Sequence, residues 1–362
     1  MQNSNCVLII PALNPRNEFV EFVKNALQYF SRIIVVNDGS KESYEHVFER
    51  IKEFDGVTCI THKKNMGKGR AIKSAIDYYQ KSAMYVNFQG IITADSDGQH
   101  SLDDVISLDK SLAENPDKSF FIGFRNLNSP IMPKRSKFGN RVTAFLYRSL
   151  YGIKLKDTQS GLRAFRNGII SWAMSVSGER FEWEMNVLIK LKNVDFKIME
   201  VAITTKYEKE HKSTFRTIKD STRVMGILLA GIIKYVFSAL CASIVDVGVF
   251  VLLYYLLLPS IISSIALSLL VSSVVSRVFS SIINYLANRF LTFGGKRISK
   301  KSILKYYLLW LIQLSLSYGL LTTLTLLLGG GEIAIKIIID LILALISYQI
   351  QLRYVFKKKE QV

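Results

Sequence analysis

The chain has 362 residues, 49% of them hydrophobic, and carries a net charge of +18 at pH 7. Its three cysteines are too few and too dispersed for a disulfide-stapled secreted fold, and its four histidines lack the spacing of zinc ligands. The length allows two domains, and the apolar residues are concentrated toward the C-terminus, so we expect two parts of different character.

The first eighty residues alternate between strand and helix patterns. Buried-type strands are predicted at 7–14 and 33–36, and a helix with one apolar face is predicted at 18–30 between them. A Gly-rich turn at 65–69 then opens a second helix that continues to about Gln80. This alternation predicts a mainly parallel sheet with right-handed crossovers, in which ligands bind beyond the carboxyl ends of the strands.

A third strand is predicted at 85–93 from its β-branched and aromatic residues, and an acidic motif, Asp95-Ser96-Asp97-Gly98-Gln99-His100, follows it directly. Two carboxylates one residue apart at a strand end can chelate a hard divalent cation, and such a cation commonly holds a diphosphate. The alternative is an acidic turn that caps the helix beginning near Asp103. The same edge of the sheet is expected to hold Asn14, Asp38, 65–68 and 95–99.

Residues 125–166 form a strongly basic segment, with ten lysines and arginines against Asp157 alone. We interpret it as a surface that faces anionic headgroups and gathers phosphate, rather than as a nucleic-acid surface, because long apolar segments follow. Asp157 is either a site carboxylate or a hub of structural ion pairs. Glu182 and Glu184 begin a helix predicted at 182–192. One of them binds sugar hydroxyls with Trp183 beneath, or both form an acidic first helical turn.

Four apolar segments near the roughly 20 residues that cross a bilayer as a helix are predicted to be membrane spans: 235–258, 261–283, 306–328 and 333–356. The loop after the second span and the tail after the fourth are basic, whereas the other two loops have no basic residue. By the positive-inside rule, we expect a multi-pass cell-membrane protein with its N-terminal domain and both termini in the cytoplasm. No signal peptide is expected at the N-terminus.

Four ionisable residues fall inside the predicted spans, where an unpaired charge is costly. Asp246 and Arg277 lie at similar depth, and Lys336 and Asp340 share one helix face four residues apart. We expect each pair to form an ion pair. A polar path for a lipid headgroup is the alternative.

Six short motifs follow one another in the first part of the chain: Pro11-Ala12-x-Asn14, Asn37-Asp38-Gly39-Ser40, Asn65-x-Gly67-Lys68-Gly69, Asp95-x-Asp97-x-Gln99-His100, Gly123-x-Arg125 and Asp157-x-x-Ser160-Gly161-x-Arg163. Their order resembles that in family 2 glycosyltransferases, most closely the dolichyl-phosphate mannose synthase branch and its bacterial polyprenyl-phosphate relatives. The resemblance covers about residues 5–223. The chain departs from the family at Leu13 and Pro15, where Tyr and Glu are usual, and at Asn37, where Asp is frequent.

The apolar region resembles the GtrA-like membrane domain through Asn288–Phe293 and Arg353–Phe356, although these residues also suit a plain interfacial belt. The two resemblances together imply an α/β GT-A domain at 1–223, a juxtamembrane segment at 224–234 and an all-α GtrA-like domain of four transmembrane helices at 235–362.

The resemblance implies an inverting transfer of a sugar from a UDP- or GDP-linked donor to undecaprenyl or dolichyl phosphate, with Mg²⁺ or Mn²⁺, for cell-surface glycans. A phosphate monoester has a second pKa of about 6, so this acceptor needs no strong general base. The implied roles are catalysis by Asp97 and Asp157; metal binding by Asp95, Asp97 and Gln99; donor binding by Pro11, Ala12, Asn14, Asp38, Lys68, Asp95 and Ser96; and acceptor-phosphate binding by Arg125, Arg135, Ser160, Arg163 and Arg216.

Two other functions stay open at this point. A processive polysaccharide synthase shares such a catalytic fold, but the Gln-x-x-Arg-Trp motif usual in those enzymes is absent from the sequence. A lipid-linked sugar transporter with a regulatory nucleotide-sugar-binding domain would need no acidic metal motif. Nucleic acid is not expected as a partner, and a homo-oligomer is left open.

Overall fold

The computed structural model describes residues 4–126, 132, 134–191, 194–204, 217–261, 263–295, 297–328 and 332–356, without the side chains of 134, 135, 217–221, 223, 259 and 332. These residues form two compact units that divide after Leu228. The predicted boundary at 223 and the predicted juxtamembrane segment 224–234 both lie within one continuous helix, α9 (Thr217–Val251). No break in secondary structure therefore marks either position.

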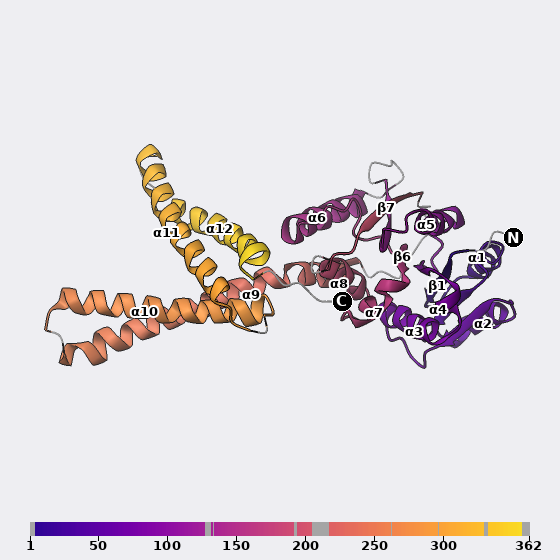
Figure 1. Ribbon diagram of the computed structural model, residues 1–362, viewed down its shortest axis with the longest axis horizontal. Coiled ribbons are helices and arrows are strands. Elements are labelled where there is room, and N and C mark those ends of the chain that lie inside the picture. Colours follow the sequence, from indigo (N-terminus) through magenta and orange to yellow (C-terminus); the bar gives the residue numbers. More distant parts are fainter. Residues whose placement is uncertain are drawn as a thin grey trace. The chain divides into compact units, whose positions relative to one another are not determined.

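The first unit is built on a seven-stranded sheet with the order β3-β2-β1-β4-β6-β5-β7 (Figure 1). Every neighbouring pair is parallel except those of β6, which runs antiparallel to both β4 and β5, so the predicted mainly parallel sheet is confirmed. The strands are β1 (Cys6–Ala12), β2 (Ile33–Asn37), β3 (Val57–Thr61), β4 (Gly90–Thr93), β5 (Phe120–Arg125), β6 (Arg163–Arg166) and β7 (Ile198–Ile203). The helices are α1 (Glu18–Ala26), η1 (Glu42–Tyr44), α2 (Glu45–Lys52), α3 (Lys68–Lys81), α4 (Met84–Asn87), α5 (Leu102–Glu114), α6 (Lys134–Tyr151), α7 (Asn167–Ser175) and α8 (Glu182–Leu191).

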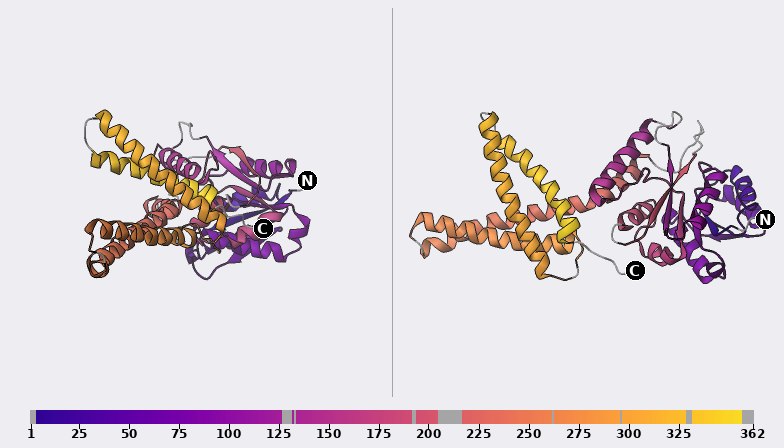
Figure 2. Two further views of the ribbon diagram at one scale, coloured as in Figure 1. Left: turned by 60° about the vertical axis from the view of Figure 1, so that its left-hand side comes forward. Right: turned by 45° about the horizontal axis from the view of Figure 1, so that its top comes forward.

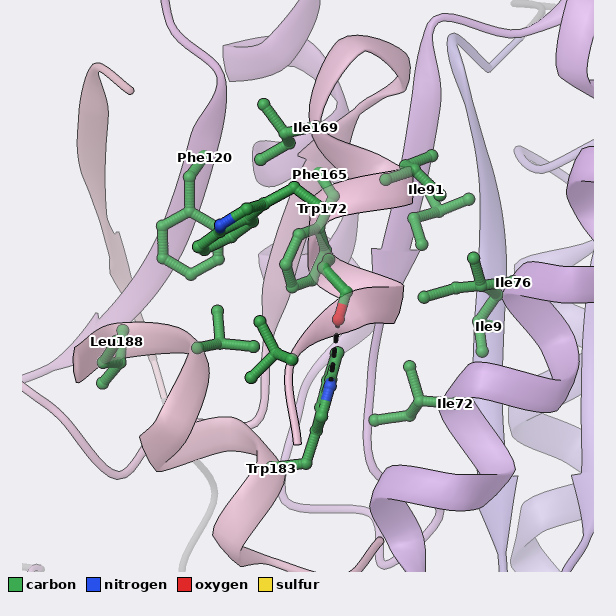
Figure 3. Close-up of a cluster of buried hydrophobic side chains, with 14 of the residues drawn as sticks. Ile9, Ile72, Ile76, Ile91, Phe120, Phe165, Ile169, Trp172, Trp183 and Leu188 are labelled. Atoms are coloured by element: carbon green, nitrogen blue, oxygen red, sulfur yellow. Dashed lines mark hydrogen bonds between the residues drawn. The ribbon is translucent and has the colours of Figure 1, made fainter. Parts of the chain in front are cut away.

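Helices cover both faces of this sheet because successive side chains of a strand point to opposite sides. In β1, Val7 and Ile9 pack in the core shared with α3, α7 and α8, whereas Leu8 and Ile10 pack in the core shared with α1, α2 and α5. Figure 3 shows the first of these cores, where the Trp183 indole donates a hydrogen bond to the Ala173 carbonyl at 3.2 Å. Because helices cover both faces of the sheet, a site can form only at the ends of the strands.

The predicted strand at 85–93 is wrong in its first half. The structure has the short helix α4 there, and only β4 is extended. The Asn167 side-chain amide donates to the carbonyls of Tyr85 and Phe88 at 2.9 and 2.7 Å, which fixes this turn. Tyr85 and Phe88 still pack against the core, so tertiary contacts outweigh their preference for strands.

The second unit consists of helices long and apolar enough to cross a membrane, and the four predicted spans are confirmed at Val224–Leu257, Ile265–Thr292, Lys300–Leu328 and Ile333–Val355. Figure 2 shows α10 running back alongside α9, and α12 running back alongside α11. The elements after α9 are η2 (Leu252–Leu257), η3 (Leu258–Ser260), α10 (Ile265–Ala287), η4 (Asn288–Thr292), α11 (Lys300–Leu328), α12 (Glu332–Ile350) and η5 (Gln351–Val355).

Both predicted ion pairs within the spans are confirmed. Arg277 Nε lies 3.4 Å from Asp246 Oδ2, between α10 and α9. Lys336 Nζ lies 2.9 Å from Asp340 Oδ1 on α12, and the Ser317 hydroxyl of α11 donates to the same carboxylate. Each charge thus has a partner of opposite sign within the apolar segments.

Charge reversal tests the pair between α9 and α10. Asp246→Arg is expected to lower the amount of full-length protein in the membrane fraction, because an unpaired Arg near the centre of a span costs about 2.5–3.5 kcal/mol on insertion. Adding Arg277→Asp restores opposite charges and should restore accumulation toward the wild-type amount. A double variant that accumulates no better than Asp246→Arg would show that the two residues do not support each other.

Candidate active site

The predicted site residues that the structure describes converge on one edge of the sheet. Ala12 at the end of β1 pairs with Asn37 at the end of β2, and Ile9 pairs with Thr93 at the end of β4. Because β6 runs antiparallel to β4, Thr93 pairs with Arg163 at the start of β6. The acidic motif after β4 and the segment 157–161 before β6 therefore lie at the same edge.

Lys68, the first residue of α3, lies between two carboxylates. Its Nζ is 2.6 Å from Asp95 Oδ1 and 3.0 Å from Glu184 Oε1 of α8. Burial alone would lower the pKa of Lys68, but the two carboxylates outweigh it and raise that pKa above its ordinary value. Burial likewise opposes ionisation of Asp95, but Lys68 and His100 lower its pKa. Lys68 and Asp95 are therefore both charged at neutral pH.

Asp97 is placed differently from Asp95. Its Oδ1 accepts a hydrogen bond from the backbone N–H of Gln99 at 3.1 Å. Burial and the nearby charge of Asp95 raise the pKa of Asp97 above its ordinary value. A cation beside the two carboxylates would relieve that repulsion.

The residues of the acidic motif fit a divalent metal. Across the residues that the structure describes, no three His, Cys, Asp or Glu side chains gather as a complete ligand set. Mg²⁺ is nevertheless usually held by only one or two carboxylates together with substrate phosphates and water. Two hard oxygen ligands, one of them with a raised pKa, are the donor set expected for such a shared site.

Gly161 lets the backbone before β6 lie against the Lys68–Asp95 ion pair. A Cβ at this position would lie 2.5 Å from Asp95 Oδ2 and 2.7 Å from Lys68 Nζ. The backbone before β6 can therefore approach the ion pair only because residue 161 has no side chain.

Gly161→Ala is expected to reduce catalytic activity about 10- to 100-fold, because it displaces the tips of Lys68 and Asp95 by up to about 1 Å. The colliding atoms end flexible side chains, so the apparent melting temperature should change little. Gly168→Ala in α7 is the matched control, since a Cβ there meets nothing within 4 Å. Unchanged turnover in Gly161→Ala would contradict the close approach.

Asp157 is a hub for buried hydrogen bonds. Its side chain is fully buried, and the Arg125 guanidinium donates to both of its oxygens, at 2.6 and 3.1 Å. Asn140 Nδ2 and the Gln159 N–H donate to Oδ1 at 2.7 and 2.9 Å. Burial raises the pKa of Asp157, but Arg125 and these donors outweigh it and lower that pKa. The contacts match the ion-pair alternative, and in this geometry Asp157 orients Arg125 instead of facing a substrate.

Arg163, one of the residues predicted to bind the acceptor phosphate, is also interior. Its side chain is 1% exposed, and its guanidinium donates to the carbonyls of Ser160 and Glu184 at 3.0 and 2.7 Å. Arg163 therefore ties the segment before β6 to the start of α8, and Ser160 is buried beside it. Arg216 and the side chain of Arg135 lie outside the described residues.

The other residues predicted to bind the donor lie near the ends of β1 and β2 and in the acidic motif. Asp38 is 3% exposed, and its carboxylate accepts from the N–H groups of Met66 and Gly67 at 2.9 and 2.7 Å. It therefore holds the turn before α3 through both of its oxygens. Asn14 has φ +50°, and its Oδ1 accepts from the Lys41 N–H at 2.9 Å, which links the ends of β1 and β2. Pro11 and Ala12 are buried in β1, whereas Ser96 and Gln99 are partly buried in the acidic motif.

Three residues have roles that the sequence did not indicate. His62 Nδ1 lies 2.8 Å from Asp38 Oδ1, and the place of His62 just after β3, a third strand end at this edge, was the available signal. Asn140 holds Asp157 from α6. Glu184, which the sequence could not separate from Glu182, is the one that reaches Lys68. Of the two alternatives for this turn, the one that places Trp183 beneath a sugar does not hold, because the ring is fully buried in the core.

Comparisons with known proteins agree with this architecture. Residues 7–171 match the model of Glycosyl transferase family 2, and residues 234–356 match that of the GtrA/DPMS transmembrane domain. The chain is 30% identical over 218 residues to a UDP-N-acetylglucosamine–dolichyl-phosphate N-acetylglucosaminyltransferase of Methanococcus voltae, covering 55% of this chain and 85% of that protein. It is 24% identical over 215 residues to a dolichyl-phosphate beta-glucosyltransferase of Trichomonas vaginalis, covering 54% and 64%.

Among solved structures, glucosyl-3-phosphoglycerate synthase of Mycobacterium tuberculosis aligns with a TM-score of 0.45 at 15% identity, covering 63% of this chain and 79% of that one. The two matched domains and the relative at 30% identity show that the chain belongs to glycosyltransferase family 2 and is a membrane-bound glycosyltransferase with a GtrA/DPMS transmembrane domain.

Proposed function

We propose that this enzyme transfers one sugar from a nucleotide diphosphate donor to the phosphate of a polyprenyl lipid. The names of the relatives support this acceptor, and the relative from Methanococcus voltae supports UDP-N-acetylglucosamine as the first donor to test. The basic loop after α10 and the basic tail support a cytoplasmic catalytic domain, where nucleotide sugars are found.

The observation that carries the proposal is the group of Lys68, Asp95 and Glu184 with Asp97 beside it, at the carboxyl end of β4. Asp95 and Asp97 would hold Mg²⁺ or Mn²⁺, which when bound neutralises charge on the leaving diphosphate. Lys68 stays protonated and is positioned by its two carboxylates, so it can donate to a diphosphate oxygen.

The acceptor side rests on Arg125. Asp157 holds its guanidinium by two hydrogen bonds, while the Arg125 side chain keeps 15% of its surface exposed. An acceptor phosphate would be oriented there by a fixed cation. One of its oxygens then attacks the anomeric carbon, a new C–O bond forms with inversion, and the bond to the diphosphate breaks. The dianionic phosphate has no proton to lose, so no general base is required.

A transfer assay tests the proposal against its alternatives. Membranes containing the full-length enzyme and undecaprenyl or dolichyl phosphate are supplied with radiolabelled UDP- or GDP-sugars, and lipid extracts are separated by chromatography. One discrete glycolipid is the expected product. A polymer would instead identify a processive synthase, and absence of transfer with every donor would favour a transporter.

One face of α6 supports contact of the catalytic domain with lipid. Phe138 and Phe145 are 71% and 69% exposed, Arg141 is exposed between them, and Arg148 is exposed one turn after Phe145. Exposed aromatic rings between arginines are typical of a helix that lies in the membrane interface. Its opposite face carries Asn140, which holds Asp157, so α6 would join the lipid surface to the acceptor side of the site.

Phe138→Ser with Phe145→Ser is therefore expected to raise the apparent KM for a long-chain acceptor in vesicles about tenfold. Each buried aromatic ring contributes roughly 1.5–3 kcal/mol, and only part of each would insert. Turnover of a short-chain, detergent-soluble acceptor should stay unchanged. Val86→Ser is the control, since Val86 is 86% exposed on α4. An equal loss with both acceptors would contradict the role of this face in membrane contact.

A further inference from the structure

A second cluster of cations lies in the membrane unit, away in sequence from every residue of the proposed site. Arg289, Lys301, Lys305 and Arg353 line one cavity of about 350 Å³. None of the described residues that line this cavity is Asp or Glu. Its volume lies within the range of about 300–1,000 Å³ that is typical of small-molecule sites.

Arg289 is held in place by three separate features. Its Nε and one terminal nitrogen both donate to the Arg297 carbonyl, at 2.9 and 2.6 Å. The guanidinium carbon lies 5.6 Å from the centre of the Phe356 ring. A Cβ at residue 295 would collide with Arg289 Nε, so Gly295 leaves the room that this position needs. The positive-inside rule accounts for basic residues in this loop, but it does not require a fixed guanidinium.

The start of α11 adds to the positive potential of the cavity. Lys301 lies in its first turn, which contains no acidic residue. The N-terminal end of a helix is already the positive end of its dipole, so cations there repel it and an anion is favoured. Lys305 lies one turn further along and donates to the Tyr354 carbonyl of η5 at 3.2 Å. Four cations from three elements therefore converge on a cavity whose described lining residues include no carboxylate.

We propose that this cavity binds the phosphate of an anionic lipid headgroup. The cavity lies where α10, α11 and the helix that ends in η5 reach one end of their membrane-length segments, which is the depth at which lipid phosphates are found. Guanidinium groups bind phosphate through paired N–H donors, and Arg353 and Arg289 bring two such groups to one cavity. The site is distinct from the proposed transfer reaction and does not depend on it.

Lipid retention by the full-length protein tests this site without any nucleotide sugar. The protein is equilibrated in mixed vesicles of phosphatidylglycerol and phosphatidylcholine, extracted in mild detergent, and its bound lipids are counted by mass spectrometry. The wild type should retain phosphatidylglycerol over phosphatidylcholine, and Arg289→Gln should lower that retention about tenfold, as expected for loss of a charge-assisted contact. Arg297→Gln removes the same charge from the same loop but keeps the carbonyl that Arg289 uses, so it should retain the lipid.

Gly295→Ala tests whether the position of the Arg289 guanidinium matters apart from its charge. It keeps all four cations but displaces that guanidinium. It should also lower retention, and it serves as the test if Arg289→Gln does not fold. Equal retention in the wild type, Arg289→Gln and Gly295→Ala would overturn the proposal. Competition distinguishes sources of phosphate: polyprenyl phosphate should displace phosphatidylglycerol at lipid concentrations, and inorganic phosphate should not. Displacement by inorganic phosphate at the same concentrations would overturn the assignment to a lipid.

Discussion

Asp97→Asn is expected to leave less than about a tenth of the wild-type transfer activity, a loss of more than about 1.4 kcal/mol of transition-state stabilisation. Asp97 is the carboxylate of the acidic motif that does not bind Lys68, and burial together with the charge of Asp95 disfavours its ionised form. Removing that charge removes a hard ligand for a divalent cation. The measurement is sugar transfer by purified, reconstituted protein as Mg²⁺ or Mn²⁺ is titrated.

Asp103→Asn provides the matched control, because Asp103 is an exposed carboxylate in the first turn of α5. It should keep near wild-type transfer and metal dependence. The melting temperatures of both variants should resemble that of the wild type. If folded Asp97→Asn keeps more than a tenth of the activity at saturating metal, the metal assignment fails.

Arg125→Ala is expected to produce the largest loss of stability, about 3–5 kcal/mol at neutral pH, because it leaves the fully buried Asp157 carboxylate without its cation. The native structure lowers the pKa of Asp157, so this pair stabilises the fold above the unfolded-state pKa of about 3.9. That stabilisation is lost as the pH falls through the folded-state pKa. The gap between wild type and variant should therefore be widest near pH 7 and should narrow below about pH 4.

Apparent melting temperatures of the full-length protein in detergent, measured from pH 7 to pH 3, check this expectation. Arg141→Ala on the exposed face of α6 is the control and should change little. Adding Asp157→Asn to Arg125→Ala removes the unpaired charge and should recover part of the loss. A difference between Arg125→Ala and wild type that does not depend on pH would show that Asp157 is not the group involved.

Much of the architecture could be predicted because its signals are local. Apolar strands alternating with one-sided helices predict a parallel sheet, and the charges within long apolar runs predict their own pairing. Asp246 with Arg277 and Lys336 with Asp340 are found paired, since an isolated charge in those segments would be costly.

The sequence predicts the structure least well where contacts between residues distant in the sequence determine it. The resemblance implies that Arg163 binds the acceptor phosphate, but two backbone carbonyls accept from its guanidinium inside the fold. Residues 85–88 resemble a strand, yet the distant Asn167 side chain holds them in a helical turn. The partners of Asp38 and Glu184 could not be predicted for the same reason. Gly67 and Lys68, which they contact, are distant from them in the sequence.

The reversed strand β6 has a consequence for how enzymes of this architecture can diversify. The chain leaves the sheet after β5 and returns in β6, and the two strands are hydrogen-bonded neighbours, with Ile122 opposite Arg163. The excursion between them, residues 126–162, includes α6 and Asp157, while the acidic motif and Lys68 lie outside it. An insertion whose two ends are adjacent can be exchanged without altering the rest of the sheet. Evolution could therefore vary the surroundings of Arg125, the cation proposed to orient the acceptor phosphate, while conserving Lys68 and the acidic motif. Chimaeras that swap 126–162 between relatives offer the same route in the laboratory.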